Sequence, residues 1–410
     1  MKKLIYILLL SLFLTILLSS EKNEEGIYMY KNNPQRTGYY DTYGPDKTPV
    51  VKWKIDLKKK LKDKEIHIKF QPLIYKNNLY LTTWGEYEYI ISININNGKI
   101  NWFKKFDTHK TGFIARSSII FNDNIILTYQ TEIKSININN KKEIWTYKIE
   151  GAVPLDSPII LSEPVLGDGV IYIGINDWRN IPDDAEEGLA TTYLLAIDSE
   201  TGKKLWKLKL QDGGISDLAY DKGYLYFSVY NRSYCMDVKT KKFKWITGNK
   251  IFYEKSIITE DKQIIWNENY YFIKALDKET GKLLWERKFE GGVIREVSYH
   301  NGKLYFGVKR NGRNSKLYVL DSKTGKILKE YNFNEYVYKN GPFITRNIFL
   351  MASYIKMYAY DINSNNLLWS WSEKIFLDEK DTISSYPIIK DGRIYFYTWA
   401  QKIYCLEEKK

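Results

Sequence analysis

The sequence predicts an all-β protein, a single eight-bladed β-propeller built from four-stranded antiparallel blades. Three observations predict this fold. A tryptophan recurs eight residues after an acid or amide, a glycine-type turn often separates the two, and one copy of the pattern is split between the chain ends. Repeats of about 45 residues that each contain several short strands are typical of propellers.

The tryptophan repeat is clearest between Ala196 and Trp206, where Asp198 lies eight residues before the tryptophan. Asp321 begins another copy but reaches Lys329 at the tryptophan position. The remaining complete copies keep the same spacing and are Asn94 with Trp102, Asn137 with Trp145, Asp237 with Trp245, Asp277 with Trp285, and Asp361 with Trp369.

Each copy is preceded by two more strand-like runs, so the repeating unit has four strands. In the third copy these runs are Pro164–Leu166 and Val170–Ile173, joined by the turn Asp168-Gly169. The turn before the tryptophan holds a glycine in several copies, for example Gly202, because such a turn needs a positive φ. The acid before it can accept hydrogen bonds from the turn, and the tryptophan can pack against the neighbouring sheet.

The split copy predicts how the ring closes. Trp53 lies in a strand-like run with no repeat start before it, and Cys405 begins a repeat that has no tryptophan after it. We expect the strand around Trp53 to be the outer strand of the last blade, beside Ile403–Leu406. A linear β-solenoid is the alternative, but only a ring needs two complementary halves, and closure leaves no exposed sheet edge.

The segments outside the repeats predict the remaining organisation. Residues 1–20 contain two lysines and the apolar run Leu4–Leu18, which is typical of a secretory signal or an N-terminal anchor. Residues 21–49 are expected to be extended, and residues 50–410 to form the propeller. We therefore expect an exported protein, periplasmic or at the cell surface. We do not expect a lipoprotein, because no cysteine stands directly after the apolar run, where a lipid would be attached.

The net charge of +13 is compatible with acidic partners, but the basic residues are dispersed along the chain. No basic cluster indicates a nucleic-acid partner. We expect a monomer, with membrane association through the N-terminal segment as one further alternative.

The repeat resembles that of the PQQ-like propellers, the family of quinoprotein alcohol dehydrogenases and of the outer-membrane assembly lipoprotein BamB. The segment Ala275–Trp285 is similar to the family consensus, and Met29–Gly38 resembles the opening segment of BamB-like members. The resemblance covers roughly residues 27–407. For the catalytic branch it implies a quinone cofactor, a vicinal cysteine pair and a calcium site beside a catalytic aspartate.

The residues that would carry this chemistry are not evident from the sequence. Cys235 and Cys405 cannot form a vicinal pair, and on opposite sides of the ring they are expected to be free, buried thiols. The repeat acids are committed to turns, and the histidines His67, His109 and His300 lack metal-site spacing. The sequence therefore predicts no catalytic, cofactor-binding or metal residue.

The third blade carries the most irregular connections. One joins its second and third strands, roughly Asn176–Thr192, and another, Glu150–Glu163, leads into the blade. We consider three interpretations: a solvated insertion, a calcium loop and a partner-binding loop. The candidate residues of this connection are Trp178, Arg179, Asp183, Asp184, Glu186 and Glu187.

Trp84 and Trp399 occupy equivalent places after the second strands of the first and eighth blades, which are neighbours. They are candidates for a recognition patch on the same face, and packing between blades is the alternative. Together these features favour a non-catalytic, BamB-like scaffold that binds a protein or an envelope polymer through one face. The alternative is a pyrroloquinoline-quinone-dependent oxidoreductase.

Overall fold

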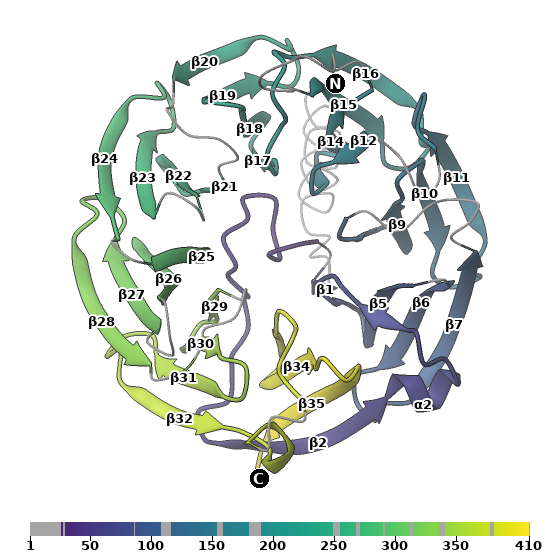
Figure 1. Cartoon of the computed structure of the whole chain (residues 1–410), viewed down its shortest axis with the longest axis vertical. Coiled ribbons are helices and arrows are strands. Elements are labelled where there is room, and N and C mark those ends of the chain that lie inside the picture. Colours follow the sequence, from purple (N-terminus) through teal and green to yellow (C-terminus); the bar gives the residue numbers. More distant parts are fainter. Residues whose placement is uncertain are drawn as a thin grey trace, which may run out of the picture.

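Eight antiparallel sheets surround a central axis in the computed structural model (Figure 1). In each blade the strands are arranged side by side from the axis to the outer wall, and neighbouring strands pair with each other. This confirms the predicted fold. The residues described are 26–27, 29–85, 87–107, 116–153, 159–179, 190–248, 255–267, 271–289, 292–310, 315–333, 335, 341–377 and 381–409.

The first four blades follow one another along the chain, and blades 1 and 3 carry additional short strands. Blade 1 consists of β1 (Gly26–Ile27), β3 (His67–Ile68), β4 (Leu73–Tyr75), β5 (Asn78–Trp84), β6 (Tyr87–Asn94) and β7 (Ile100–Asp107). Blade 2 consists of β8 (Ile119–Phe121), β9 (Asn124–Thr128), β10 (Glu132–Asn137) and β11 (Glu143–Lys148). Blade 3 consists of β12 (Ile159–Leu161), β13 (Val165–Gly167), β14 (Val170–Asp177), β15 (Thr191–Asp198) and β16 (Lys204–Lys209). Blade 4 consists of β17 (Ala219–Asp221), β18 (Tyr224–Val229), β19 (Arg232–Asp237) and β20 (Phe243–Gly248).

The remaining blades each have four strands. Blade 5 consists of β21 (Lys255–Ile258), β22 (Lys262–Asn267), β23 (Phe272–Asp277) and β24 (Leu283–Lys288). Blade 6 consists of β25 (Gly292–His300), β26 (Lys303–Arg310), β27 (Ser315–Asp321) and β28 (Ile327–Phe333). Blade 7 consists of β29 (Phe343–Ile344), β30 (Ile348–Ala352), β31 (Met357–Asp361) and β32 (Leu367–Trp371). Blade 8 consists of β33 (Ile388–Lys390), β34 (Arg393–Tyr397), β35 (Lys402–Glu408) and, outermost, β2 (Pro49–Asp56).

Burial along the strands follows their distance from the axis. Every residue of β30 is buried, because both faces of this strand contact neighbouring blades. The outer strand β24 instead has exposed residues alternating with partly buried ones, because one of its faces meets solvent. Short apolar strands inside and alternating strands outside are what stacked sheets around an axis require.

The ring closes as the sequence predicts. Strand β2 pairs antiparallel with β35, which places Trp53 opposite Cys405. The Trp53 indole nitrogen donates to the Ile95 carbonyl oxygen of blade 1 at 3.0 Å. Residues from both ends of the chain thus complete blade 8 and hold it against blade 1.

The tryptophans of the outer strands dock onto the turn of the next blade. Trp145 of blade 2 donates from its indole nitrogen to the Ser199 carbonyl oxygen of blade 3 at 3.1 Å. A Cβ atom on Gly202 would lie 2.5 Å from the Trp145 ring, and Gly202 has φ of +69°. Asp198 accepts hydrogen bonds from the backbone nitrogens of Glu200 and Thr201, as the repeat predicts.

An inner segment, residues 29–46, passes through the centre of the ring (Figure 1). Its main chain forms hydrogen bonds with the innermost strands of four successive blades. The carbonyl oxygens and the amides that donate to them are Pro34 with Tyr220, Gln35 with Ile258, Thr37 with Tyr299, and Gly38 with Ile344. At its end, Pro45 accepts the indole hydrogen bond of Trp369 at 2.8 Å. For Trp145 and Trp285, the repeat turn of the next blade accepts the indole hydrogen bond. For Trp369 of blade 7, the inner segment provides this acceptor instead.

Among the described residues, two short helices lie outside the blades, α2 (Leu57–Leu61) and α4 (Lys374–Leu377). Within the described ranges, no helix is long and apolar enough to cross a membrane. The predicted signal or anchor, residues 1–20, lies outside the described residues. Cys235 and Cys405 are free and buried, in blades 4 and 8, and burial raises the pKa of the Cys235 thiol to about 11.

Candidate functional site

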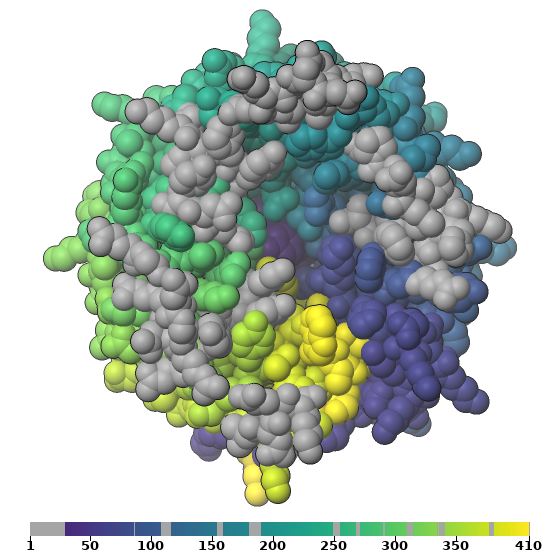
Figure 2. All heavy atoms as spheres, in the orientation of Figure 1, coloured from purple at the N-terminus to yellow at the C-terminus, as the bar shows by residue number. Residues whose placement is uncertain are grey.

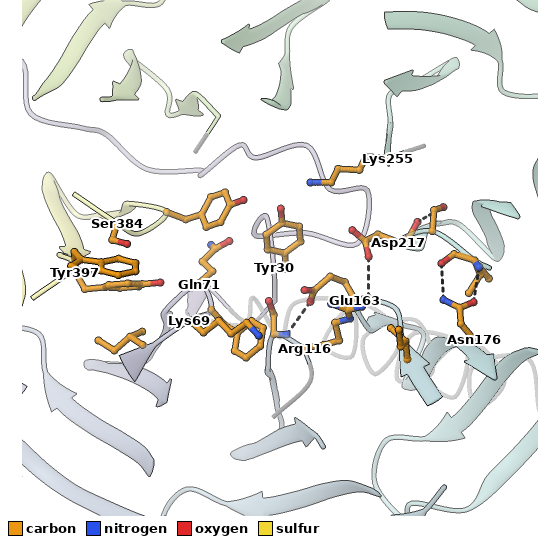
Figure 3. A pocket seen from close by; sticks show the side chains of 18 of the residues that line it. Tyr30, Lys69, Gln71, Arg116, Glu163, Asn176, Asp217, Lys255, Ser384 and Tyr397 are labelled. Carbon is orange, nitrogen blue, oxygen red and sulfur yellow. Dashed lines mark hydrogen bonds between the residues drawn. The ribbon is translucent and has the colours of Figure 1, made fainter. Parts of the chain in front are cut away.

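A cavity of about 700 Å³ opens on the ring axis, on the face that carries the connections between second and third strands and between successive blades. Figure 2 shows this face hollowed at its centre, and Figure 3 shows side chains reaching into the hollow from the inner ends of several blades. Cationic, acidic and aromatic residues line it together. The main ones are Tyr30, Lys69, Arg116, Glu163, Trp178, Asp217, Lys255, Tyr386, Tyr397 and Trp399.

Six of the polar lining residues occupy the same structural position in six different blades. The position is defined from the pairing of the innermost strand with the second strand of the blade. In blade 4, Tyr220 of the innermost strand pairs with Leu225, the second residue of β18. The residue three positions before Tyr220 is Asp217, and the same count gives one residue in every blade. We call this set the axial ring. Its members in blade order are Gln71, Ser117, Glu163, Asp217, Lys255, Glu296, Gly341 and Tyr386.

Two carboxylates of the axial ring are neighbours. Asp217 accepts a hydrogen bond from the Glu163 backbone nitrogen at 3.1 Å, and the Glu163 carboxylate accepts one from the Ser117 backbone nitrogen at 2.9 Å. Burial raises the pKa of Glu163, and the charge of Asp217 raises it further, although Arg116 and Arg36 act in the opposite direction. A half-buried carboxyl group at a cavity wall with a raised pKa is suited to taking up and releasing a proton.

Arg36 of the inner segment lies next to this pair and is 2% exposed. Its guanidinium donates to three carbonyl oxygens, those of Tyr30, Pro164 and Leu218, at 2.9, 2.6 and 3.0 Å. Pro164 follows Glu163 and Leu218 follows Asp217 in the chain. One buried cation therefore joins the inner segment to both carboxylate-bearing positions.

On the other side of the axis, Glu296 is held between two lysines. Lys31 lies 2.9 Å from its carboxylate and Lys255 lies 2.6 Å from it. Burial alone would raise the pKa of Glu296, but the charges and hydrogen bonds of Lys255 and Lys31 lower this pKa to about 2. Glu296 is therefore ionised, and Lys255 is fixed at the cavity wall.

Aromatic rings form much of the remaining wall. The rings of Tyr30 and Tyr386 meet edge to face with centroids 5.7 Å apart. The indole nitrogen of Trp178 is buried and has no hydrogen-bond partner among the described residues. Trp399 is 66% exposed at the mouth of the cavity. The wall thus offers flat apolar faces beside charged groups and one unused donor.

The structure brings together only some of the residues predicted from the sequence. Trp178 and Trp399 line the cavity, and Trp84 lies beside it at the end of β5. Arg179 instead donates to the Asp177 carboxylate at 2.8 and 2.6 Å. Asp183, Asp184, Glu186 and Glu187 lie outside the described residues.

Sequence reasoning missed most of the cavity, including Tyr30, Lys69, Arg116, Glu163, Asp217 and Lys255. A signal existed in the chain, because several axial-ring positions directly precede a proline at the start of an inner strand, as in Glu163-Pro164 and Tyr386-Pro387. Aligning this position across all repeats would have identified polar residues where the fold needs none.

The fold and this cavity define a tryptophan-docking propeller with a ligand-sized polar chamber on its axis. The family model described as "Outer membrane protein assembly factor BamB" matches residues 46–247 and 190–410. The chain therefore belongs to this family, and the predicted resemblance to PQQ-type propellers is confirmed.

Two curated relatives with matching sequence are named as quinone-type alcohol dehydrogenases. Quinoprotein alcohol dehydrogenase PedH from Pseudomonas putida is 26% identical over 227 residues, 52% of this chain and 30% of the relative. The dehydrogenase subunit of a quinone-type alcohol dehydrogenase from Gluconobacter oxydans is 42% identical over 71 residues, 15% of this chain and 9% of the relative. The chain thus spans less than a third of the length of either relative.

Solved structures share the fold at low sequence identity. A europium-containing methanol dehydrogenase superposes with a TM-score of 0.69 at 12% identity, over 95% of this chain and 91% of that chain. A quinohemoprotein alcohol dehydrogenase from Comamonas testosteroni also has a TM-score of 0.69 and 12% identity, over 94% and 81%.

These comparisons correct two predictions made from the sequence. The protein was expected to be a non-catalytic, BamB-like scaffold and not an enzyme. The curated relatives with matching sequence are named as alcohol dehydrogenases, which contradicts both expectations and favours the quinone-dependent alternative. The error came from treating the lack of a local motif as the lack of a site, whereas the polar cavity is assembled from residues of several blades and of the inner segment. The matching family model is named for an outer-membrane assembly factor, which agrees with the coarser prediction of an exported protein.

Proposed function

We propose that this protein is a quinone-dependent oxidoreductase that oxidises an alcohol in the axial cavity. The observation that carries the proposal is the composition of that cavity, where Lys69, Arg116 and Lys255 stand beside aromatic rings and a half-buried carboxylate pair. The names of the curated relatives support the same chemistry.

The cavity residues fit the main features of pyrroloquinoline quinone, a flat aromatic molecule with three carboxylates. Lys69, Arg116 and Lys255 line the cavity with two carboxylates, Glu163 and Asp217. Lys255 also pairs with Glu296, but Lys31 and Arg36 add two cations next to the wall, so five positive groups stand against three negative ones and favour an anionic ligand. A planar ring could stack on the aromatic side chains of Tyr30, Tyr386 and Trp178. The indole N–H of Trp178 could donate a hydrogen bond to the ligand, because it has no acceptor among the described residues.

Two features of the catalytic branch are not reproduced. The chain has two cysteines, in separate blades, so no vicinal disulfide can cover the ring of a cofactor. Within the described ranges, no group of three or more histidine, cysteine, aspartate or glutamate side chains is arranged to hold a metal. In this chain the aromatic rings therefore serve as the stacking surface.

The chain's own residues would bind the cofactor and handle the substrate proton. When bound, an ortho-quinone supplies a two-electron acceptor for the conversion of an alcohol to a carbonyl compound. Arg116 and Lys255 would pair with ligand carboxylates and fix its orientation. Glu163, whose pKa is raised by burial, would accept the hydroxyl proton of the alcohol. Arg36 would hold Glu163 and Asp217 in place through the carbonyl groups that follow them.

Reconstitution tests the proposal. Purified protein mixed with pyrroloquinoline quinone and calcium should oxidise primary alcohols with a redox dye, in a saturable and quinone-dependent reaction. Glu163→Gln should lower turnover by about 100-fold without loss of cofactor binding. The exposed Glu286→Gln is the matched control and should be fully active. Turnover no greater than that of free quinone, across a panel of alcohols, would refute the proposal.

We also propose that the protein works in the periplasm or at the cell surface. The apolar run Leu4–Leu18 and the envelope role for which the family is named support this location. Cell fractionation followed by immunodetection is the test, and a protein confined to the cytosol would contradict it.

A further inference from the structure

The rim of the cavity face carries a lysine-rich segment between blades 8 and 1. Residues 57–69 contain six lysines and two acids, and they connect β2 to β4 by way of α2 and β3. We call the exposed members the lysine rim. They are Lys59, Lys60, Lys62, Lys64 and Lys69. In Figure 2 this purple segment lies on the viewed face beside the yellow strands of blade 8.

Two acids close to the lysine rim, Asp56 and Asp63, accept structural hydrogen bonds. Asp56 accepts from the Lys59 backbone nitrogen at 3.1 Å and caps α2. Asp63 accepts from the Glu65 backbone nitrogen at 3.0 Å and from the Tyr89 hydroxyl at 2.8 Å. Within the described part of the chain, Lys60, Lys62 and Lys64 form no ion pair. Lys59 lies 3.7 Å from the Asp56 carboxylate, but six lysines against the two acids of residues 57–69 still leave this segment with an excess of positive charge.

Two exposed tryptophans flank the same segment. Trp84 pairs with His67 across β5 and β3, and the Lys69 ammonium lies 5.5 Å from the Trp84 ring centroid. On the other side, Gln401 accepts from the Ile68 backbone nitrogen at 2.6 Å and donates to the Trp399 carbonyl oxygen at 2.8 Å. The two indoles, 37% and 66% exposed, thus stand on either side of Lys69.

We propose that the lysine rim, with Trp84 and Trp399, docks this face of the propeller on a membrane surface that contains anionic lipids. Lysines attract a negatively charged lipid surface, and each contributes when it lies close to that surface. Indole rings favour the boundary between head groups and acyl chains, where an apolar ring and a polar N–H are both accommodated. A purely polyanionic polymer would use the lysines but would have no apolar layer for the rings.

Docking through this rim would orient the molecule in a defined way. Trp399 belongs both to the rim and to the mouth of the axial cavity, so the cavity would open close to the lipid surface. The inference rests on the charges and exposures of the rim and is independent of any reaction in the cavity. It can therefore hold or fail separately from the proposed function.

Vesicle sedimentation with the full chain tests the inference. We expect the protein to bind phosphatidylglycerol-containing vesicles at least tenfold more strongly than phosphatidylcholine vesicles, and raised salt should reduce this preference. Changing Lys59, Lys60, Lys62 and Lys64 to Gln together should remove most of the preference. The pair Trp84→Ala and Trp399→Ala should weaken binding and abolish the blue shift of indole fluorescence on vesicle addition.

A matched control carries the same loss of charge on the opposite face. Lys203, Lys204, Lys239 and Lys242 are exposed and lie at or beside the turns between third and fourth strands, so changing them to Gln should leave the lipid preference intact. Equal binding to charged and neutral vesicles would overturn the proposal, because insertion of the apolar run Leu4–Leu18 would then explain the result. An equal effect of both lysine sets would also overturn it, as would binding to soluble polyanions with no lipid preference.

Discussion

The outer wall and the axis of this propeller use the same repeat in opposite ways. At the outer wall, successive blades repeat one arrangement, in which a tryptophan of one blade meets the turn of the next, as Trp145 meets Ser199 and Trp285 meets Ser322. At the axis, the eight equivalent positions hold glutamine, serine, two glutamates, aspartate, lysine, glycine and tyrosine. The outer contact is thus nearly uniform, with Lys329 of blade 6 in place of a tryptophan, whereas the axial position varies from blade to blade and holds mostly polar side chains.

The inner segment connects the two regions. Its Pro45 completes the outer docking pattern at Trp369, while its Tyr30, Lys31 and Arg36 contribute to the cavity or brace its wall. A segment that lacks the repeat therefore breaks the symmetry of the ring. It makes the cavity side of blades 3 and 4, with Arg36 beside the carboxylates, different from that of blades 5 and 6.

The largest contrast should appear between two tryptophans. Trp53→Ala removes the docking contact that closes the ring, and it should cost about 3 kcal/mol of unfolding free energy. Trp399→Ala removes an exposed ring from the cavity mouth and should change stability by less than about 0.5 kcal/mol. Denaturant unfolding of the two variants measures both values. Equal losses would mean that ring closure does not depend on the outer docking contact.

The next effect concerns acid stability at the axis. The pKa of Glu296 is about 2, below its ordinary value of 4.5. The ion pairs of Glu296 with Lys31 and Lys255 therefore stabilise the fold above pH 4.5, and this contribution is lost as the pH falls toward 2. The contribution should be about 2–3 kcal/mol. Glu296→Gln should be less stable at about pH 7 and show a shallower fall in acid.

Acid titration of unfolding, with Glu330→Gln on the outer strand β28 as control, measures this difference. The control removes a more exposed ion pair with Lys316 and should keep the wild-type acid profile. An unchanged profile for Glu296→Gln would show that the buried lysines do not hold this carboxylate.

A smaller effect separates backbone strain from tryptophan docking. Gly202→Ala combines a left-handed backbone with a close approach to the Trp145 ring, whereas Gly169→Ala meets a similar φ of +75° with nothing within 4 Å of the added carbon. Gly169→Ala should cost about 1 kcal/mol, and Gly202→Ala should cost about 1–3 kcal/mol more. Similar costs at both positions would leave the turn conformation alone as the reason for glycine.

The fold could be predicted from the sequence because its signals are local. Asp198, Gly202 and Trp206 lie within one turn and strand, and their spacing recurs along the chain. The split pattern around Trp53 and Cys405 predicted closure for the same reason. Trp84 and Trp399 are candidates because they follow second strands at equivalent places, and Trp178 is a candidate because it lies in the irregular connection of the third blade.

The cavity could not be predicted in the same way. Glu163, Asp217 and Lys255 each lie outside the tryptophan motif and come together only when successive blades surround the axis. Arg36 depends on the path of the inner segment, which is set by main-chain hydrogen bonds to distant strands and not by any side-chain pattern. A search for local catalytic motifs therefore led to the wrong expectation of a non-catalytic scaffold.

Binding of pyrroloquinoline quinone tests the central claim most directly. Equilibrium dialysis with purified protein should show saturable binding of one molecule per chain. The double variant Arg116→Gln and Lys255→Gln should bind at least tenfold more weakly, because two ligand carboxylates would lose their charged partners. The double variant Lys203→Gln and Lys239→Gln, on the opposite face, should bind as the wild type does. No saturable binding, or equal binding by all three proteins, would contradict the assignment of a quinone site to the axial cavity.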